Sequence, residues 1–140
     1  MNILLTGGNG ILGKEILKRN SNCIAPSKDE FDITNREVVF DFIKKNKFDT
    51  IIHTAALTSI RECETNKKNA WKTNVVGTQN IVDALSIYNS DADLIYLSTA
   101  CVFQGDEKMY SEISLPNPAN FYSLTKLIGE TIVKSLSNHL

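Results

Sequence analysis

Short apolar runs alternate along this chain with longer segments in which apolar residues recur at helical spacing. The runs that read as strands lie at 3–5, 23–25, 49–53 and 94–97. An uninterrupted apolar run is typical of a strand covered on both faces, as in a parallel sheet. Strands that alternate with helices build right-handed parallel units. The pattern therefore predicts an α/β fold, a doubly wound and Rossmann-like sheet in one domain, residues 1–140.

The order of strands expected for this sheet is 3-2-1-4-5, counting one further short strand at 30–33. A first helix begins at about Ile11 and stops at the polar cluster 20–22. Thr34 and Glu37 have the spacing of a capping box and predict a second helix start. Longer helical segments are expected at 66–88 and 120–137, and a loop is expected at 106–120, where two prolines bar a helix.

A glycine-rich turn, Thr6-Gly7-Gly8-Asn9-Gly10-Ile11-Leu12-Gly13, joins the first strand to the first helix. Four of the chain's seven glycines lie in it. Glycines at this point leave room for a pyrophosphate beside the backbone and a helix start. The spacing differs from the commonest dinucleotide fingerprint, and any tight strand-to-helix turn can use such glycines. Nucleotide binding and a plain tight turn both remain open from this stretch alone.

Composition narrows the partners. Fifteen basic and sixteen acidic residues give a net charge of −1, so no basic field favours nucleic acid or an anionic membrane surface. Met1 leads directly into a strand without a long apolar segment, so we expect a cytoplasmic protein. Cys23, Cys63 and Cys101 lack metal-ligand spacing and are expected to be small buried apolar residues. No metal site is expected.

After the second strand, Ser27 and Lys28 stand where a dinucleotide fold reads the adenosine ribose. A hydroxyl and a cation there favour a 2′-phosphate, hence NADP over NAD, although Lys28 fits a solvated loop equally well. Small residues, Ala55 and Ala56, follow the strand at 49–53 and leave room for a ligand. His53 stands alone and is expected to be a hydrogen-bonded structural residue. Trp71 is expected to contribute to packing rather than to function.

Tyr122 and Lys126 lie one turn apart on the last helix, and Thr99 follows the strand at 94–97. A phenol beside an ammonium suits proton transfer at a carbonyl, because the ammonium favours the phenolate and lowers the pKa of the tyrosine. Thr99 is placed to bind the substrate oxygen. The three residues together suit carbonyl reduction or alcohol oxidation with a nicotinamide cofactor.

These motifs, taken together and in order, resemble the amino-terminal half of the extended short-chain dehydrogenases/reductases, and most of all the dTDP-4-dehydrorhamnose reductase group. The residues that carry the match are Gly7, Gly10, Gly13, Asp32-Ile33, His53-Thr54-Ala55-Ala56, Asn74, Gly77, Asn80, Ser98-Thr99, Val102-Phe103 and the segment from Asn117 to Glu130. The resemblance implies that Thr99, Tyr122 and Lys126 are catalytic and that Lys126 also holds the nicotinamide ribose.

The resemblance further implies a set of cofactor-binding residues: Gly7, Asn9, Gly10, Ile11, Gly13, Ser27, Lys28, Asp32, Ile33, Ala55, Ala56, Asn74 and Lys126. It implies NADP(H)-dependent reduction of a 4-keto nucleotide sugar, with NAD possible. Ala100 and Cys101 depart from the acid and aromatic usual in the group, and members of the family commonly have Asn in place of His53. Two alternatives stay open: an NAD-dependent nucleotide-sugar epimerase or dehydratase, and a non-catalytic dinucleotide- or protein-binding module.

Members of this family continue into further strands and a subdomain that binds the sugar nucleotide, and Leu140 follows directly on the Tyr122–Lys126 helix. We therefore expect a sheet without its last strands, with an edge and an apolar helix side that are either covered by a partner or left marginal. A homodimer, or a partner that supplies the missing half, would provide that cover. The 140-residue chain alone is expected to turn over poorly.

Overall fold

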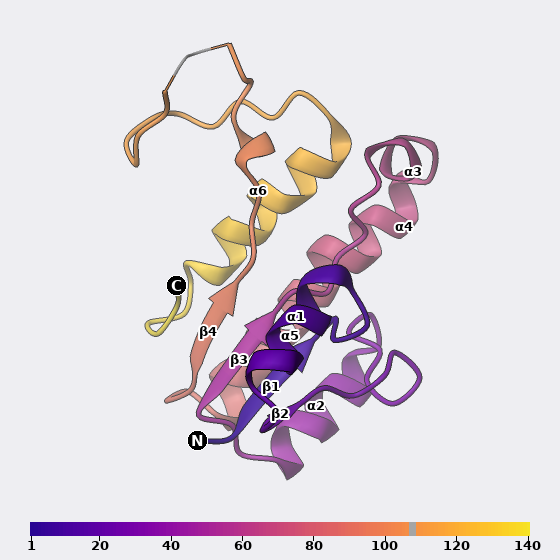
Figure 1. The fold of residues 1–140 in the computed structure, drawn as a ribbon, viewed down its shortest axis with the longest axis vertical. Coiled ribbons are helices and arrows are strands. Elements are labelled where there is room, and N and C mark those ends of the chain that lie inside the picture. Colours follow the sequence, from indigo (N-terminus) through magenta and orange to yellow (C-terminus); the bar gives the residue numbers. More distant parts are fainter. Residues whose placement is uncertain (107–108) are drawn as a thin grey trace.

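A computed structural model describes residues 1–106 and 109–140, and it contains a parallel sheet of four strands in the order β2-β1-β3-β4 (Figure 1). The strands are β1 (Ile3–Thr6), β2 (Cys23–Ile24), β3 (Thr50–His53) and β4 (Asp93–Tyr96). Leu4, Leu5 and Ile51 are fully buried, as expected of strands covered on both faces. The predicted α/β class and parallel sheet are confirmed.

The strand predicted at 30–33 does not form, so the order 3-2-1-4-5 is wrong in its first position, and the other four strands keep their expected places. The polar residues of this segment make turns instead. The carboxylate of Glu30 accepts hydrogen bonds from the nitrogen and the hydroxyl of Ser27, at 2.8 and 2.9 Å. Phe31 and Ile33 are buried in the core. The alternation of apolar and polar residues at 30–33 therefore comes from a loop that buries every second side chain.

The helices are α1 (Ile11–Arg19), α2 (Arg36–Lys45), α3 (Ile60–Thr65), α4 (Lys67–Trp71), α5 (Gly77–Tyr88) and α6 (Phe121–Val133), with a π-helical turn η1 (Lys72–Val76) and a 3₁₀ turn η2 (Ala100–Val102). The single helix predicted at 66–88 is thus α4, η1 and α5 in succession. The cap of α2 is Asn35 rather than Thr34, because the Asn35 side chain accepts from the Glu37 and Val38 nitrogens.

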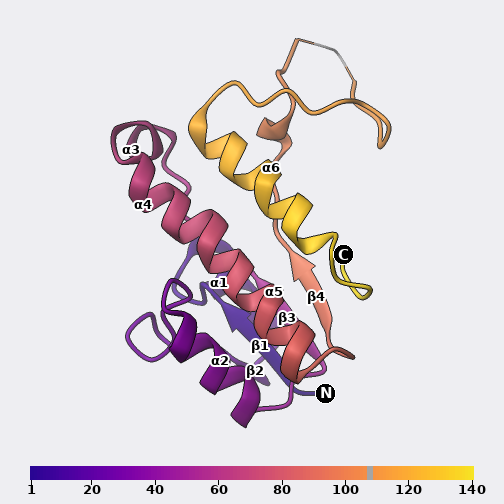
Figure 2. The same cartoon turned by 180° about the vertical axis from the view of Figure 1, so that it is seen from behind.

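Helices cover the two faces of the sheet unequally. In Figure 1, α1 lies in front of the strands, and Figure 2 shows α2, α5 and α6 on the opposite face. The core lies between that second layer and the sheet, and it is built from Leu4, Phe31, Ile33, Val39, Ile43, Phe48, Ile51, Ile81, Leu85, Leu94 and Val133. The carboxyl ends of all four strands point to one edge, where the candidate site lies.

The outer edge of β4 is partly covered by the chain itself. The Leu94 nitrogen donates to the Asn138 carbonyl at 3.0 Å, and the Leu140 nitrogen donates to the Leu94 carbonyl at 2.9 Å, in a parallel arrangement. The Tyr96 nitrogen donates to the Leu140 carbonyl. Residues 138–140 therefore satisfy some of the backbone groups that an edge strand exposes, and the covering partner stays a prediction.

Several expectations about single residues change. Trp71 is 42% exposed, so part of its side chain lies in solvent. Cys63 is buried as predicted, whereas Cys23 is half-buried and Cys101 is exposed. The predicted loop at 106–120 holds for the residues that the structure describes, and residues 107–108 lie outside them. No helix within the described ranges has the length and apolar character needed to cross a bilayer.

Candidate functional site

The glycine turn begins where β1 ends, and its backbone conformation requires a glycine. Gly7 has φ +74°, and a Cβ at this position would lie 2.7 Å from the Ala55 nitrogen. The Gly10 nitrogen donates to the Gly7 carbonyl at 2.9 Å, and a Cβ on Gly13 would lie 2.3 Å from that same carbonyl oxygen. The turn is therefore packed tightly between α1 and the loop after β3, and neither neighbour leaves space for a side chain.

Helix α1 starts at this turn with free amides. Gly10 is its N-cap residue, and no side chain caps the first turn. Amides at a helix start carry partial positive charge and are suited to bind an anion. The start of α1 is thus available to a phosphate group that enters the cavity beside it.

A cavity of about 410 Å³ opens at the turn. Its wall includes eight of the predicted cofactor residues, namely Gly7, Asn9, Gly10, Lys28, Asp32, Ile33, Ala55 and Ala56. The wall does not include Ile11, Gly13, Ser27, Asn74 or Lys126. Ile11 points to solvent, with 91% of its surface exposed. The structure therefore gathers eight of the thirteen predicted cofactor residues in one cavity wall, and the other five lie outside that wall.

Six polar residues of the wall are not among the predicted cofactor residues: Thr6, Thr34, Thr54, Glu62, Asn69 and Thr73. Thr54 directly follows β3, so the rule that ligands bind at the carboxyl ends of strands points to it. Asn69 and Thr73 come from α4 and η1, far along the chain from the glycine turn. No local pattern indicates that these two residues reach the cavity.

The neighbouring residues Ser27 and Lys28 have different surroundings in the structure. Ser27 is bound to Glu30, whereas Lys28 lines the cavity. Burial acts to raise the pKa of Asp32, but the Thr34 hydrogen bond and the charges of Lys28 and Lys72 hold it below its ordinary value. Asp32 is consequently a carboxylate flanked by two cations. Of the two residues predicted to read the adenosine ribose, Ser27 and Lys28, Lys28 lines the cavity and Ser27 does not.

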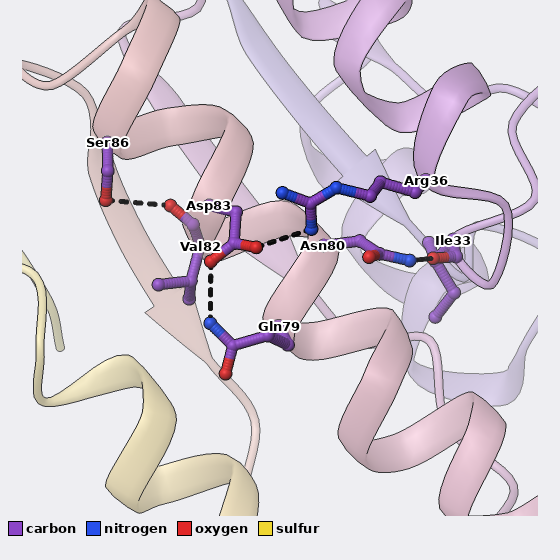
Figure 3. Close-up of polar contacts among 7 residues, drawn as sticks. All are labelled: Ile33, Arg36, Gln79, Asn80, Val82, Asp83 and Ser86. Atoms are coloured by element: carbon purple, nitrogen blue, oxygen red, sulfur yellow. Dashed lines mark hydrogen bonds and ion pairs between the residues drawn. The ribbon is translucent and has the colours of Figure 1, made fainter.

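Helix α5 holds the loop that carries Asp32 and Ile33. Figure 3 shows the Asn80 side chain donating to the Ile33 carbonyl, at 2.9 Å, and Arg36 paired with Asp83, at 2.5 Å. Gln79 binds the second oxygen of the same carboxylate. A Cβ at Gly77 would lie 2.7 Å from the Ile33 side chain, so Ile33 packs directly on the helix. These contacts fix one wall of the cavity.

A second network crosses the carboxyl edge of the sheet, where Thr6, His53 and Tyr96 stand side by side. The Thr78 hydroxyl donates to the Asn74 carbonyl at 2.7 Å, so it accepts from His53 Nε2 at 3.1 Å. His53 Nδ1 then accepts from the Thr6 hydroxyl at 2.7 Å. Burial, with the nearby charge of Lys126, lowers the pKa of His53 to about 3. His53 is a neutral structural residue, as its pattern predicts.

Asn74 connects the cavity to α6. Its side chain binds both backbone groups of Leu57, accepting from the nitrogen at 2.8 Å and donating to the carbonyl at 3.0 Å. It also donates to the Thr125 hydroxyl at 2.9 Å, which in turn donates to the Tyr122 carbonyl. Leu57 lines the cavity, so one buried amide joins the cavity wall to the helix of Tyr122 and Lys126.

Thr99, Tyr122 and Lys126 are not part of the cavity wall. Burial raises the pKa of Tyr122, and a hydrogen bond with the Thr99 side chain acts in the opposite direction. The prediction that Lys126 lowers this pKa is therefore wrong. The Lys126 ammonium lies over the ring of Tyr96 instead, with Nζ 4.0 Å from the ring centroid. Burial lowers the pKa of Lys126 to about 8, although Glu130 opposes the shift.

A family model described as the RmlD substrate binding domain matches residues 1–140. The chain belongs to this family. A dTDP-4-dehydrorhamnose reductase from Aggregatibacter actinomycetemcomitans is 33% identical over 141 residues, which cover 96% of this chain and 47% of that protein. A methionine adenosyltransferase 2 subunit beta from Xenopus tropicalis is 34% identical, over 93% of this chain and 42% of the relative.

A solved structure is similar over nearly the whole chain. The dTDP-4-dehydrorhamnose reductase from Bacillus anthracis, in complex with NADP, superimposes with a TM-score of 0.92 and 34% identity, covering 99% of this chain and 51% of that one. The chain thus spans about half the length of the family members it matches. The resemblance to the dTDP-4-dehydrorhamnose reductase group and the Rossmann-like fold are confirmed.

Proposed function

We propose that this chain is the dinucleotide-binding part of an NADP(H)-dependent reductase whose substrate is a 4-keto nucleotide sugar of the dTDP class. The observation that carries the proposal is the link through Asn74 between the glycine-lined cavity and the helix of Tyr122 and Lys126. The names of the reductase relatives support the substrate class, and the relative solved with NADP supports the cofactor.

The residues present fit a dinucleotide. Gly7 and Gly10 let a pyrophosphate approach the backbone, and the free amides of α1 face it. Lys28 attracts a 2′-phosphate, a role that Ser27 cannot share while Glu30 holds its hydroxyl. The proposed binding set around these residues is Asn9, Ile11, Gly13, Asp32, Ile33, Ala55, Ala56 and Asn74, with Lys126 on the nicotinamide ribose.

The bound cofactor supplies a hydride, and the chain supplies position and a proton. Because burial raises its pKa, Tyr122 is protonated at neutral pH and donates its phenolic proton to the oxygen of the sugar carbonyl as that carbonyl is reduced. The Thr99 hydroxyl orients the same oxygen. Lys126 holds ribose hydroxyls with its ammonium. This chain by itself turns over poorly in the proposal, because it spans about half of its reductase relatives.

Calorimetric titration with NADPH and with NADH tests cofactor binding. We expect wild type to bind NADPH more tightly than NADH, and Lys28→Gln to weaken NADPH by about tenfold while leaving NADH unchanged. Lys14→Gln, an exposed substitution on α1, is the control for net charge. Absence of binding to both cofactors would overturn the proposal.

Turnover separates the catalytic role from simple binding. Tyr122→Phe should abolish the slow oxidation of NADPH by a dTDP-4-keto sugar and leave NADPH affinity within about twofold. A non-catalytic binding module would instead show the same background rate in wild type and Tyr122→Phe. Robust turnover by the 140-residue chain would contradict the expected dependence on further parts of the reductase.

A further inference from the structure

Tyr96 lies at the carboxyl end of β4, between the sheet and α6, and its ring lies against the ammonium of Lys126. Lys126 is only 4% exposed, and Nζ is 4.0 Å from the ring centroid. Among the described residues, no oxygen accepts a hydrogen bond from this nitrogen, and the nitrogen atom itself keeps some contact with solvent. The face of an aromatic ring is electron-rich and attracts a cation, more strongly where water is excluded. The ring is thus a direct contact that helps to offset the burial of this charge, beside the more distant charge of Glu130.

The hydroxyl of Tyr96 contacts the same helix. It donates to the Lys126 carbonyl at 3.4 Å, a long hydrogen bond. A Cβ at Gly129 would lie 2.0 Å from this oxygen, so the missing side chain of Gly129 makes the space that the hydroxyl occupies. Tyr96 therefore contacts Lys126 at its ammonium and at its backbone, and its ring is held in one place by α6.

Among the described residues, the other charged or titratable groups around Lys126 make no hydrogen bond or ion pair with its ammonium. Glu130, one turn further along α6, accepts a hydrogen bond from the Ser98 hydroxyl. On β3, His53 is neutral, and its ring centroid is 5.7 Å from that of Tyr96. Tyr122 lies one turn before Lys126 and has a raised pKa. Burial likewise raises the pKa of Tyr96, so its ring stays uncharged.

We propose that Tyr96 is a positioning residue of this site: its ring face holds the Lys126 ammonium in the orientation in which that ammonium meets ligand hydroxyls. The extension to ligand binding rests on the proposed function, whereas the contact between ring and ammonium does not. Preorganisation by packing of this kind fixes a functional group before the ligand arrives. A role for Tyr96 in filling the core alone would make the electron density of the ring irrelevant.

The first experiment changes the ring electronics at constant shape. In the 140-residue protein, Tyr96 is replaced by Phe and then by 3,4,5-trifluorophenylalanine, and the Lys126 side chain is titrated by NMR of labelled lysine, with Lys126→Met to assign the signal. We expect Phe to leave the midpoint near the wild-type value and fluorination to lower it by about 0.5 pH unit, because the ring then stabilises the ammonium less. An unchanged midpoint on fluorination would overturn the proposal.

Tyr88 provides the matched control for fluorination. Its ring lies 5.6 Å from the Lys44 nitrogen, on a different side of the fold. The same fluorinated residue at Tyr88 should leave the Lys126 midpoint unchanged. A shift of equal size from both positions would show a general effect of the substitution on the fold and would contradict the specific role of Tyr96.

The second experiment tests the consequence for ligand binding through a double-mutant cycle. Tyr96→Met, which keeps apolar volume, should weaken NADPH by about threefold to tenfold, and Lys126→Met/Tyr96→Met should bind no more weakly than Lys126→Met alone. Wild-type affinity in Tyr96→Met, or additive losses, would refute the positioning role. If wild type binds no NADPH, the proposed function fails, and the fluorination series still decides whether the ring holds the ammonium.

Discussion

Removal of the buried charge at Lys126 should stabilise the protein at neutral pH. The pKa of Lys126 falls from its ordinary 10.5 to about 8 because the side chain is buried. One pKa unit corresponds to about 1.36 kcal/mol, so the charged lysine costs the native state roughly 3 kcal/mol relative to the unfolded state. Lys126→Met fills similar space without the charge. We expect it to raise the free energy of unfolding at pH 7 by up to this amount, less the lost contact with Tyr96.

The pH dependence identifies the cause. The folded pKa lies below the unfolded pKa, so the native state gains stability as the pH rises from about 8 towards 10.5, and loses it as the pH falls back through 8. Wild type should therefore gain about 2.5 kcal/mol relative to Lys126→Met between pH 7 and pH 10. Urea denaturation of both proteins across this range measures the difference directly.

Lys134→Met is the control, because Lys134 is exposed at the C-cap of the same helix. The same measurements on Lys134→Met report what the loss of an exposed lysine on this helix does to stability. A constant difference between wild type and Lys126→Met from pH 7 to pH 10 would refute the reasoning, since the lysine would then titrate alike in the folded and unfolded states. The expected result would make Lys126 a residue whose function costs stability.

Three further substitutions test the surroundings of the site. Gly7→Ala places a methyl group 2.7 Å from the Ala55 nitrogen at a positive φ, and urea denaturation should show a loss of about 2 kcal/mol or more beyond that of Gly105→Ala, which shares a positive φ but meets no atom within 4 Å. Asn74→Ala should cost about 2–3 kcal/mol in the same assay, because it removes the bonds to Leu57 and Thr125; an unchanged midpoint would mean that these bonds do not hold the wall. Between pH 7 and pH 5, wild type should lose about 2 kcal/mol of stability relative to His53→Asn. The pKa of His53 is about 3 in the folded state and 6.5 in the unfolded state, so stability that is present above pH 6.5 is lost as the pH falls. Parallel stability curves for the two proteins would contradict a neutral His53 in the folded state.

The sequence predicts the sheet well because each of its strands is a compact apolar run. It fails at 30–33, where the alternation of Phe31 and Ile33 matches a strand but arises from packing under a loop. A pattern of apolar positions reports burial, and burial is shared by strands and by covered loops. The N-cap of α2 is Asn35, one residue after the predicted Thr34, and both residue types are able to cap a helix.

The candidate site is predictable only where it lies at ends of elements. The glycine turn and Ala55-Ala56 follow strands directly, and the cavity contains them. The aromatic ring that contacts the Lys126 ammonium cannot be predicted from the helix sequence. Helical spacing points to Tyr122, whereas tertiary packing brings Tyr96 from β4. The same burial reverses the predicted shift in the pKa of Tyr122. Asn69 and Thr73 reach the cavity through the π-turn region, which local periodicity does not reveal.

The most direct test of the dinucleotide site is an NMR titration of the 140-residue protein with NADPH, followed through backbone amide signals. We expect saturable shifts concentrated in Gly7–Gly13 and in the loop from Ala55 to Leu57, with smaller changes transmitted through Asn74 to α6. Gly7→Ala should abolish these shifts at the same NADPH concentrations. Absence of shifts in wild type, or shifts confined to residues remote from the glycine turn, would contradict a dinucleotide site at this turn.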